Sequence, residues 1–106
     1  MEMETIMMEL VVNGGNGRSK ALEAVRAARI NHMEQAEALM QECNEAIGKA
    51  HQFQTELLQK SLNLDSKDST PVNLLVVHGQ DHLMDAMVVR DLAVEMIEMY
   101  RLIYSR

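Results

Sequence analysis

Residues 33–61 read MEQAEALMQECNEAIGKAHQFQTELLQKS, a stretch in which small and apolar residues return every third or fourth position for four heptads. This spacing places them on one face of an α-helix, with most charged side chains on the other. The stripe comprises Met33, Ala36, Met40, Cys43, Ile47, Ala50, Gln54, Leu57 and Ser61. A repeat this regular predicts a long helix that packs in a coiled-coil-like manner.

The segments before and after this stretch show the same helical spacing. The earlier stripe comprises Ile6, Met7, Leu10, Val11, Gly14, Ala21, Leu22, Val25 and Ala28. The later stripe comprises Leu75, His78, His82, Asp85, Val89, Leu92, Met96, Met99 and Ile103. Both patterns predict helices, and a helix of roughly 30 residues is about 45 Å long.

These three segments predict an all-α fold in one domain, residues 1–106, with helices at about 4–30, 32–62 and 71–104. Short connections favour an up-down-up three-helix bundle. The regular heptads also suggest packing between subunits, as in a coiled-coil-like homotrimer.

Three local signals mark the predicted helix ends and one interruption. Asn31 is expected to cap the second helix, with Glu34 three residues later as in a capping box. Thr70-Pro71 is typical of an N-cap followed by proline at the first helical position. The run Gly14-Gly15-Asn16-Gly17 either kinks the first helix or lets another backbone approach closely.

Composition excludes several classes of function. The net charge is −6 and no two basic residues are adjacent, which argues against binding to nucleic acid. The single cysteine, Cys43, forms no intramolecular disulfide and is expected to pack as a small apolar residue. No apolar run approaches ~18 residues and the N-terminus is acidic, so we expect a cytoplasmic protein.

The apolar pattern of the third segment breaks at consecutive positions. His78, His82 and Asp85 replace apolar residues there, and Asp81 lies on the same side. Burying such groups costs several kcal/mol unless they are paired, metal-bound or partly hydrated. The pattern therefore indicates either a functional site or a structural polar layer.

Two kinds of chemistry fit this cluster. His78 and His82, four residues apart on a helix, can contribute to a metal site, although zinc needs three or four ligands. A neutral imidazole is also a nucleophile that can accept a phosphoryl group, with His82 and the Gln80 amide as hydrogen-bond donors. The spacing does not decide between metal binding and phosphoryl acceptance.

The run from Val77 to Met84, VHGQDHLM, resembles the active-site helix of the lactose/cellobiose-specific enzyme IIA family of sugar phosphotransferase systems. The segments GGNGRS (14–19) and AHQFQTELL (50–58) also resemble that family, in the expected order. The similarity covers nearly the whole chain, and the histidine-containing run is its most specific part.

The resemblance implies a phosphocarrier, a component of a sugar phosphotransferase. His78 would accept the phosphoryl group from the histidine-containing phosphocarrier protein and pass it to a cysteine of enzyme IIB. Asp81 of each subunit in a homotrimer would lie at the axis and bind a divalent metal, expected to be Mg²⁺. The sugar, a β-linked disaccharide of the lactose, cellobiose or chitobiose type, is not determined by these motifs.

Two other functions remain as alternatives: a metal-binding helical bundle without chemistry, and a purely structural oligomerisation module. His51 and Gln54 either face the His78 region or are polar residues with a structural role.

Overall fold

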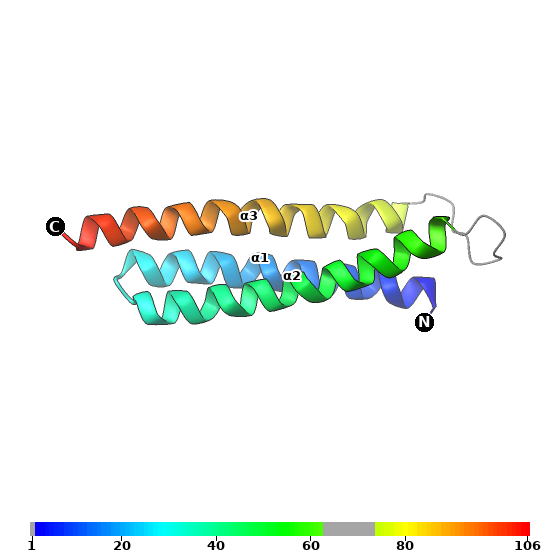
Figure 1. The fold of residues 1–106 in the computed structure, drawn as a ribbon, viewed down its shortest axis with the longest axis horizontal. Helices are drawn as coiled ribbons and strands as arrows, with labels where there is room; N and C mark the ends of the chain where they lie inside the picture. The colour runs from blue at the N-terminus through cyan, green and yellow to red at the C-terminus, as the bar shows by residue number, and fades with distance from the viewer. Residues whose placement is uncertain (1, 63–73) are drawn as a thin grey trace.

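The computed structural model describes residues 2–62 and 74–106, which form three long helices. These are α1 (Met3–Arg29), α2 (Met33–Leu62) and α3 (Leu74–Tyr104). Consecutive helices run in opposite directions, so that α1 and α3 are parallel (Figure 1). The all-α, up-down-up arrangement predicted from the periodicity is confirmed. Thr70-Pro71 and the expected start of the third helix at 71 lie outside the described residues.

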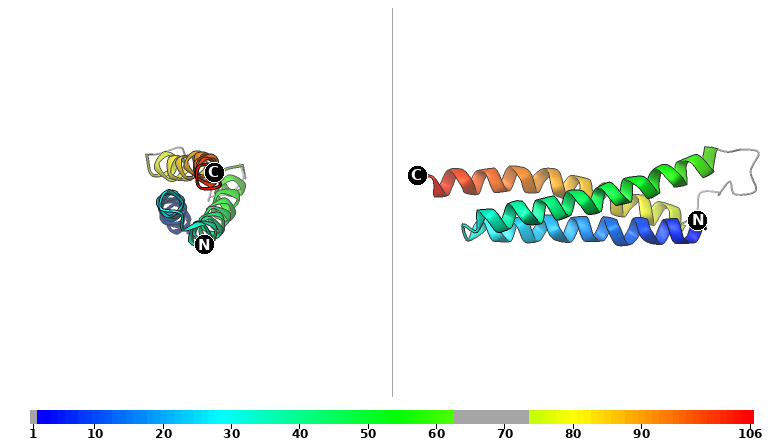
Figure 2. Two further views of the ribbon diagram at one scale, coloured as in Figure 1. Left: turned by 90° about the vertical axis from the view of Figure 1, so that its left-hand side faces the viewer. Right: turned by 60° about the horizontal axis from the view of Figure 1, so that its bottom comes forward.

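The bundle is a narrow rod of 61 × 18 × 17 Å. Seen from its end, the three helices occupy the corners of a triangle (Figure 2). α1 packs along both other helices, whereas α2 and α3 touch each other much less. The core is therefore centred on α1, and its side chains are mostly small or aliphatic, including Leu10, Ala21, Ile47 and Leu83.

The turn between α1 and α2 is built differently from the prediction. Asn31 has φ 63°, the left-handed conformation that asparagine tolerates better than most residues. The amides of Asn31 and His32 donate to the carbonyls of Ala28 and Ala27, a Schellman motif. Asn31 therefore terminates α1, and the expectation that it caps α2 is wrong.

The glycine run lies inside α1 without interrupting it. A Cβ atom on Gly17 would lie 2.8 Å from Cγ1 of Ile47 on α2, and one on Gly14 would meet the backbone of α3. Of the two alternatives for this run, close approach of neighbouring helices is confirmed. The absent side chains let α1 contact both partners within about one turn.

The buried stripes of α1 and α2 include about half or more of the predicted positions, such as Ile6, Leu10, Cys43 and Ile47, whereas none of the residues predicted for α3 is buried. The buried residues of α3 are Gly79, Leu83, Ala86, Ala93 and Ile97. Leu92, Met96, Met99 and Ile103 of the predicted stripe are exposed in the single chain. Because α3 is apolar on most of its circumference, its periodicity did not identify the one face that packs on α1.

As a result, α3 presents a long uncovered apolar face. Of the exposed large apolar residues in the described part of the chain, all but Met8, Val12, Ile30 and Leu58 lie on α3. They are Leu74, Val77, Met84, Val88, Leu92, Val94, Met96, Met99, Leu102, Ile103 and Tyr104. Contiguous exposed apolar surface of this kind marks an interaction site. None of the described helices is long and apolar enough to cross a membrane.

Candidate functional site

His78 and His82 form a contacting pair of imidazoles on α3. Their Nε2 atoms are 3.2 Å apart, a hydrogen-bond distance, and the rings meet nearly edge to face with centroids 4.5 Å apart. A hydrogen bond between two ring nitrogens requires a proton on one and a lone pair on the other. His78 is exposed and His82 is half-buried. The pair thus combines an accessible nitrogen with a more sheltered one that can donate to it.

Helix α1 sets the position of this pair. A Cβ atom on Gly14 would lie 2.9 Å from the carbonyl carbon of His82 and 3.1 Å from its Cβ. One turn earlier, a Cβ on Gly79 would be 3.4 Å from Cβ of Leu10. Gly14 of α1 thus faces α3, and Gly79 of α3 faces α1. They allow α1 and α3 to approach closely where the histidines lie.

A pocket of about 340 Å³ opens beside His82. Gly15 and Arg18 of α1 form one side, and His82, Asp85, Val88 and Val89 of α3 form the other. A Cβ atom on Gly15 would meet no described atom within 4 Å, so the missing side chain leaves this mouth open. The lining combines a guanidinium, an imidazole and a carboxylate above two valines, which suits a small charged group.

Gln80 faces a different helix from the histidine pair. Its Oε1 accepts a hydrogen bond of 2.8 Å from Nε2 of Gln54 on α2, and Gln54 Oε1 lies 3.3 Å from Nδ1 of His51. Residues two apart on a helix point in nearly opposite directions, which separates Gln80 from His78. Among the described residues, no hydrogen bond joins Gln80 to either histidine. The amide chain therefore ties α2 to the turn of α3 that carries His78.

The acidic residues of the cluster are not buried in the single chain. Asp81 and Asp85 are exposed, as is His78. In the described residues of one chain, no three His, Cys, Asp or Glu side chains gather closely enough to hold a metal ion.

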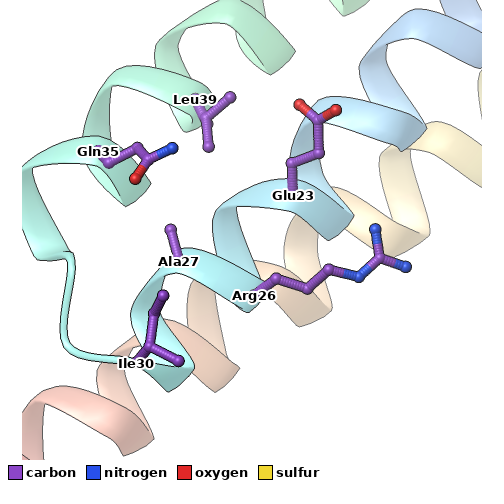
Figure 3. A pocket seen from close by; sticks show the side chains of 6 residues that line it. All are labelled: Glu23, Arg26, Ala27, Ile30, Gln35 and Leu39. Carbon is purple, nitrogen blue, oxygen red and sulfur yellow. The ribbon is translucent and has the colours of Figure 1, made fainter.

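Other candidate groups lie away from this site. Cys43 is fully buried, as expected, and burial raises the pKa of its thiol, while the positive charge of Arg90 acts in the opposite direction. A larger pocket of about 410 Å³ lies near the turn between α1 and α2 (Figure 3). Its lining contains no nucleophile: Glu23, Arg26, Ala27, Ile30, Gln35 and Leu39.

Arg18 is the site residue that sequence reasoning missed. It belongs to the quoted segment 14–19, but no role was assigned to it. The available signal was its position four residues after Gly14, which puts both on one face of α1. Only the contact between Gly14 and His82 shows that this face borders the histidines.

Comparisons with known proteins agree on one family. The profile described as "PTS system, Lactose/Cellobiose specific IIA subunit" matches residues 5–101. The lichenan-specific phosphotransferase enzyme IIA component of Bacillus subtilis is 48% identical over 99 residues, covering 93% of this chain and 87% of the relative.

Solved structures show the same fold. The cellobiose-specific enzyme IIA of Bacillus anthracis superimposes with a TM-score of 0.90 at 38% identity, over 100% of this chain and 95% of the other. A chain of the IIA(Chitobiose)–HPr complex of Escherichia coli superimposes with a TM-score of 0.82 at 33% identity, over 98% of both chains.

Proposed function

The chain belongs to the lactose/cellobiose-specific IIA family of the phosphotransferase system, and from this premise we propose that it carries a phosphoryl group on His78. The observation that supports the proposal most directly is the 3.2 Å contact between Nε2 of His78 and Nε2 of His82. It offers an exposed nucleophile beside a donor that can follow the charge as it moves. Phosphoryl transfer needs little else from a protein beyond positioning and electrostatic stabilisation.

The transfer begins with neutral His78, whose Nε2 lone pair attacks phosphorus on the phosphohistidine of the donor. As the new N–P bond forms, the donor's N–P bond breaks and its electron pair stays on the donor imidazole. For Nε2 of His78 to hold the lone pair, the hydrogen in the contact must lie on Nε2 of His82. That hydrogen can then turn to a phosphoryl oxygen and stabilise its charge.

The onward step reverses these roles. A cysteine thiolate of the cognate enzyme IIB attacks phosphorus, the bond to Nε2 of His78 breaks, and its electron pair returns to the imidazole. The donor we propose is the histidine-containing phosphocarrier protein. Its support is the structural match to a chain of a IIA–HPr complex. Both partners require access to His78, and its exposed ring provides that access.

The broader setting follows from this role. We propose a cytoplasmic protein that serves uptake of a β-linked disaccharide, with the sugar bound by the membrane component. Gln80 supports the site indirectly in this proposal, by holding α2 against the turn of α3 that carries His78. Its amide hydrogens remain candidates for donation to a partner or to the phosphoryl group.

The uncovered apolar face of α3 supports assembly as a homotrimer. Asp81 lies on this exposed side of α3, between Val77 and Met84, which are also exposed. Three Asp81 carboxylates meeting at an axis would repel one another, and a hard divalent cation such as Mg²⁺ suits an all-oxygen donor set. We propose that such a cation is held there, where it would neutralise the carboxylates and stabilise the assembly.

The decisive experiment is incubation with phosphoenolpyruvate and the general phosphotransferase proteins, followed by intact-mass measurement. We expect a gain of one acid-labile phosphoryl group. A metal-binding bundle or a purely structural module would gain none. Replacing His78 with alanine removes the nucleophile, and should abolish the gain while leaving the fold intact because the ring is exposed.

His82→Ala is the matched variant on the same helix face. It should still accept the phosphoryl group, but more slowly by ~10- to 1,000-fold, because one charge-stabilising donor is lost. Phosphorylation of the His78→Ala protein at His82 would contradict the assignment. An unchanged rate for His82→Ala would reduce that residue to a packing role.

A further inference from the structure

Arg18 lines the pocket beside His82, and its charge is not neutralised within the described chain. Arg90 and Arg101 pair with Asp91 and Glu37, whereas no ion pair or hydrogen bond of the Arg18 side chain occurs among the described residues. The residue is exposed and lines the pocket beside His82. A free guanidinium at the mouth of a pocket is able to bind an anion in two-pronged fashion.

The packing of α1 on α3 places Arg18 on the same pocket as His82. Arg18 lies one turn after Gly14, where an added Cβ atom would lie 2.9 Å from the carbonyl carbon of His82. The two helices run parallel (Figure 1). Arg18 shares its pocket with Asp85, Val88 and Val89, which follow His82 on α3. Nε2 of His82 in turn lies 3.2 Å from the nitrogen of His78 that would carry the phosphoryl group.

The charges around the pair favour a cation at this place. A phosphoryl group adds about −1.5 to −2 charge near pH 7. It would arrive on a helix face that already carries the exposed carboxylates of Asp81 and Asp85, in a chain of net charge −6. Of the six residues that line the pocket, Arg18 alone is permanently cationic.

We infer that Arg18 is a phosphoryl-binding residue, which donates its guanidinium hydrogens to the oxygens of the group on His78 and offsets the charge of Asp85. The inference rests on the proposed function, since it names a further residue of the same site. Gly15 contributes by leaving the mouth of the pocket open to the phosphoryl oxygens.

The test compares Arg18→Gln and Arg18→Lys with Arg26→Gln, a matched control. Arg26 lies two turns further along α1 and lines the pocket near the turn between α1 and α2 (Figure 3). Arg26→Gln removes the same charge as Arg18→Gln. Transfer from the phosphorylated donor is measured over a range of donor concentrations. We expect Arg18→Gln to lower kcat by ~10- to 100-fold with little change in KM, because the contact strengthens as charge develops. Arg18→Lys should recover part of the loss, and Arg26→Gln should match the wild type.

A second readout reports on the phosphoryl group itself. In phosphorus NMR titrations of the phosphorylated protein, a nearby cation favours the dianion, so the pKa of the phosphoryl group should be higher by about one unit in Arg18→Gln than in the wild type. A merely structural role for Arg18 would not move this value.

Four results would overturn the inference. A fall in kcat with an unchanged phosphoryl pKa would place Arg18 away from the group. A rise in KM alone would make Arg18 a docking contact for the donor. Wild-type rate and pKa in Arg18→Gln would leave it without a role while the proposed function stands. A wild-type chain that accepts no phosphoryl group would overturn the proposed function as well.

Discussion

The imidazole pair gains its chemical asymmetry from small differences in environment. Both rings belong to one helix, four residues apart, and their contact is a consequence of helical geometry. His82 is more buried than His78 because Gly14, which has no side chain, lets the backbone of α1 lie close to the backbone of His82. In the proposed mechanism the exposed ring is the nucleophile and the more buried ring is the donor, so the roles follow from burial and not from residue type.

Cys43 provides a prediction about pH at the residue scale. Burial raises the pKa of its thiol above the ordinary value of 9.0, with Arg90 partly opposing the rise. The folded state therefore keeps its proton at pH values where the unfolded chain loses it. This stabilisation is fully present below about pH 9 and is lost as pH rises towards the folded-state pKa.

We expect the free-energy advantage of the wild type over Cys43→Ala to be constant from pH 7 to about 8.5 and to shrink above pH 9. Urea unfolding of both proteins across this range measures the difference. Because lysines and tyrosines titrate in both proteins, their effects cancel in the comparison. An advantage that stays constant to about pH 10.5 would show that the thiol titrates alike in folded and unfolded chains.

At the scale of the elements, α1 is the helix that organises the site. Its glycines bring α2 within contact at Gly17 and α3 within contact at Gly14. A helical glycine costs roughly 0.5–1 kcal/mol relative to alanine, so the close approach must offset that cost. The tie between Gln54 and Gln80 holds the third side of the triangle, where α2 and α3 otherwise touch little. α1 thus contains glycines, which lower its helix propensity, at positions where their small size lets a turn of α3 pack closely.

Gly14→Ala tests this arrangement. The new Cβ would lie 2.9 Å from the carbonyl carbon of His82, so α3 must shift. We expect a loss of about 1–3 kcal/mol in the free energy of unfolding, the usual range for overpacking. Phosphoryl acceptance should also slow by about 100-fold, because a displacement of about 1 Å at a reacting group has that effect.

Gly48→Ala is the control, since a Cβ atom there would meet no described atom within 4 Å. It should raise stability by about 0.5–1 kcal/mol through helix propensity and leave the transfer rate unchanged. Urea unfolding and the transfer assay report both quantities. If Gly14→Ala proved as stable and as active as Gly48→Ala, close contact with α3 would not be what positions His82.

At the scale of the whole molecule, a single chain buries only part of its own apolar surface. α1 is covered on two sides, whereas α3 exposes large apolar side chains along its full length. Soluble single chains rarely leave such a continuous patch uncovered. A second and third copy of α3 would cover it and bring the Asp81 carboxylates together, which joins the proposed assembly to the proposed metal site.

We predict that the wild-type protein is a trimer at micromolar concentration by light scattering. Asp81→Leu should remain trimeric. Its free energy of unfolding should rise by about 1–4 kcal/mol, because like charges at an axis are replaced by apolar contact. A chelator should destabilise the wild type and leave Asp81→Leu unaffected if a divalent cation is bound. Thermal unfolding at a fixed protein concentration measures both effects.

Leu92→Lys serves as the control on the same face. It places a charge on the exposed apolar stripe of α3 and should dissociate the assembly. Dissociation of Asp81→Leu would mean that the carboxylates make a net favourable contribution to the interface. A monomeric wild type would remove the argument for an axis at Asp81.

The sequence by itself determined the properties that are local to each segment. The 3.6-residue period predicted three helices, which the structure has, and the spacing of His78 and His82 brought the two rings together. The resemblance of residues 77–84 to an active-site helix identified the family, which the comparisons confirm. The proposed roles of Asp81 and the trimer remain predictions.

Tertiary structure alone decided which face of each helix meets which neighbour. α3 has large apolar residues on its exposed side as well as on its buried side, so only its packing on α1 showed that Leu83 and Ala86 are buried while Asp85 and Leu92 are exposed. The same packing placed Gly14 against His82 and brought Arg18 to the pocket. Helical periodicity depends on neighbours within a turn, whereas the register between helices depends on contacts summed along their whole length. For that reason the sequence pattern predicts the helices and the histidine pair, whereas the position of Arg18 beside His82 is visible only in the folded bundle.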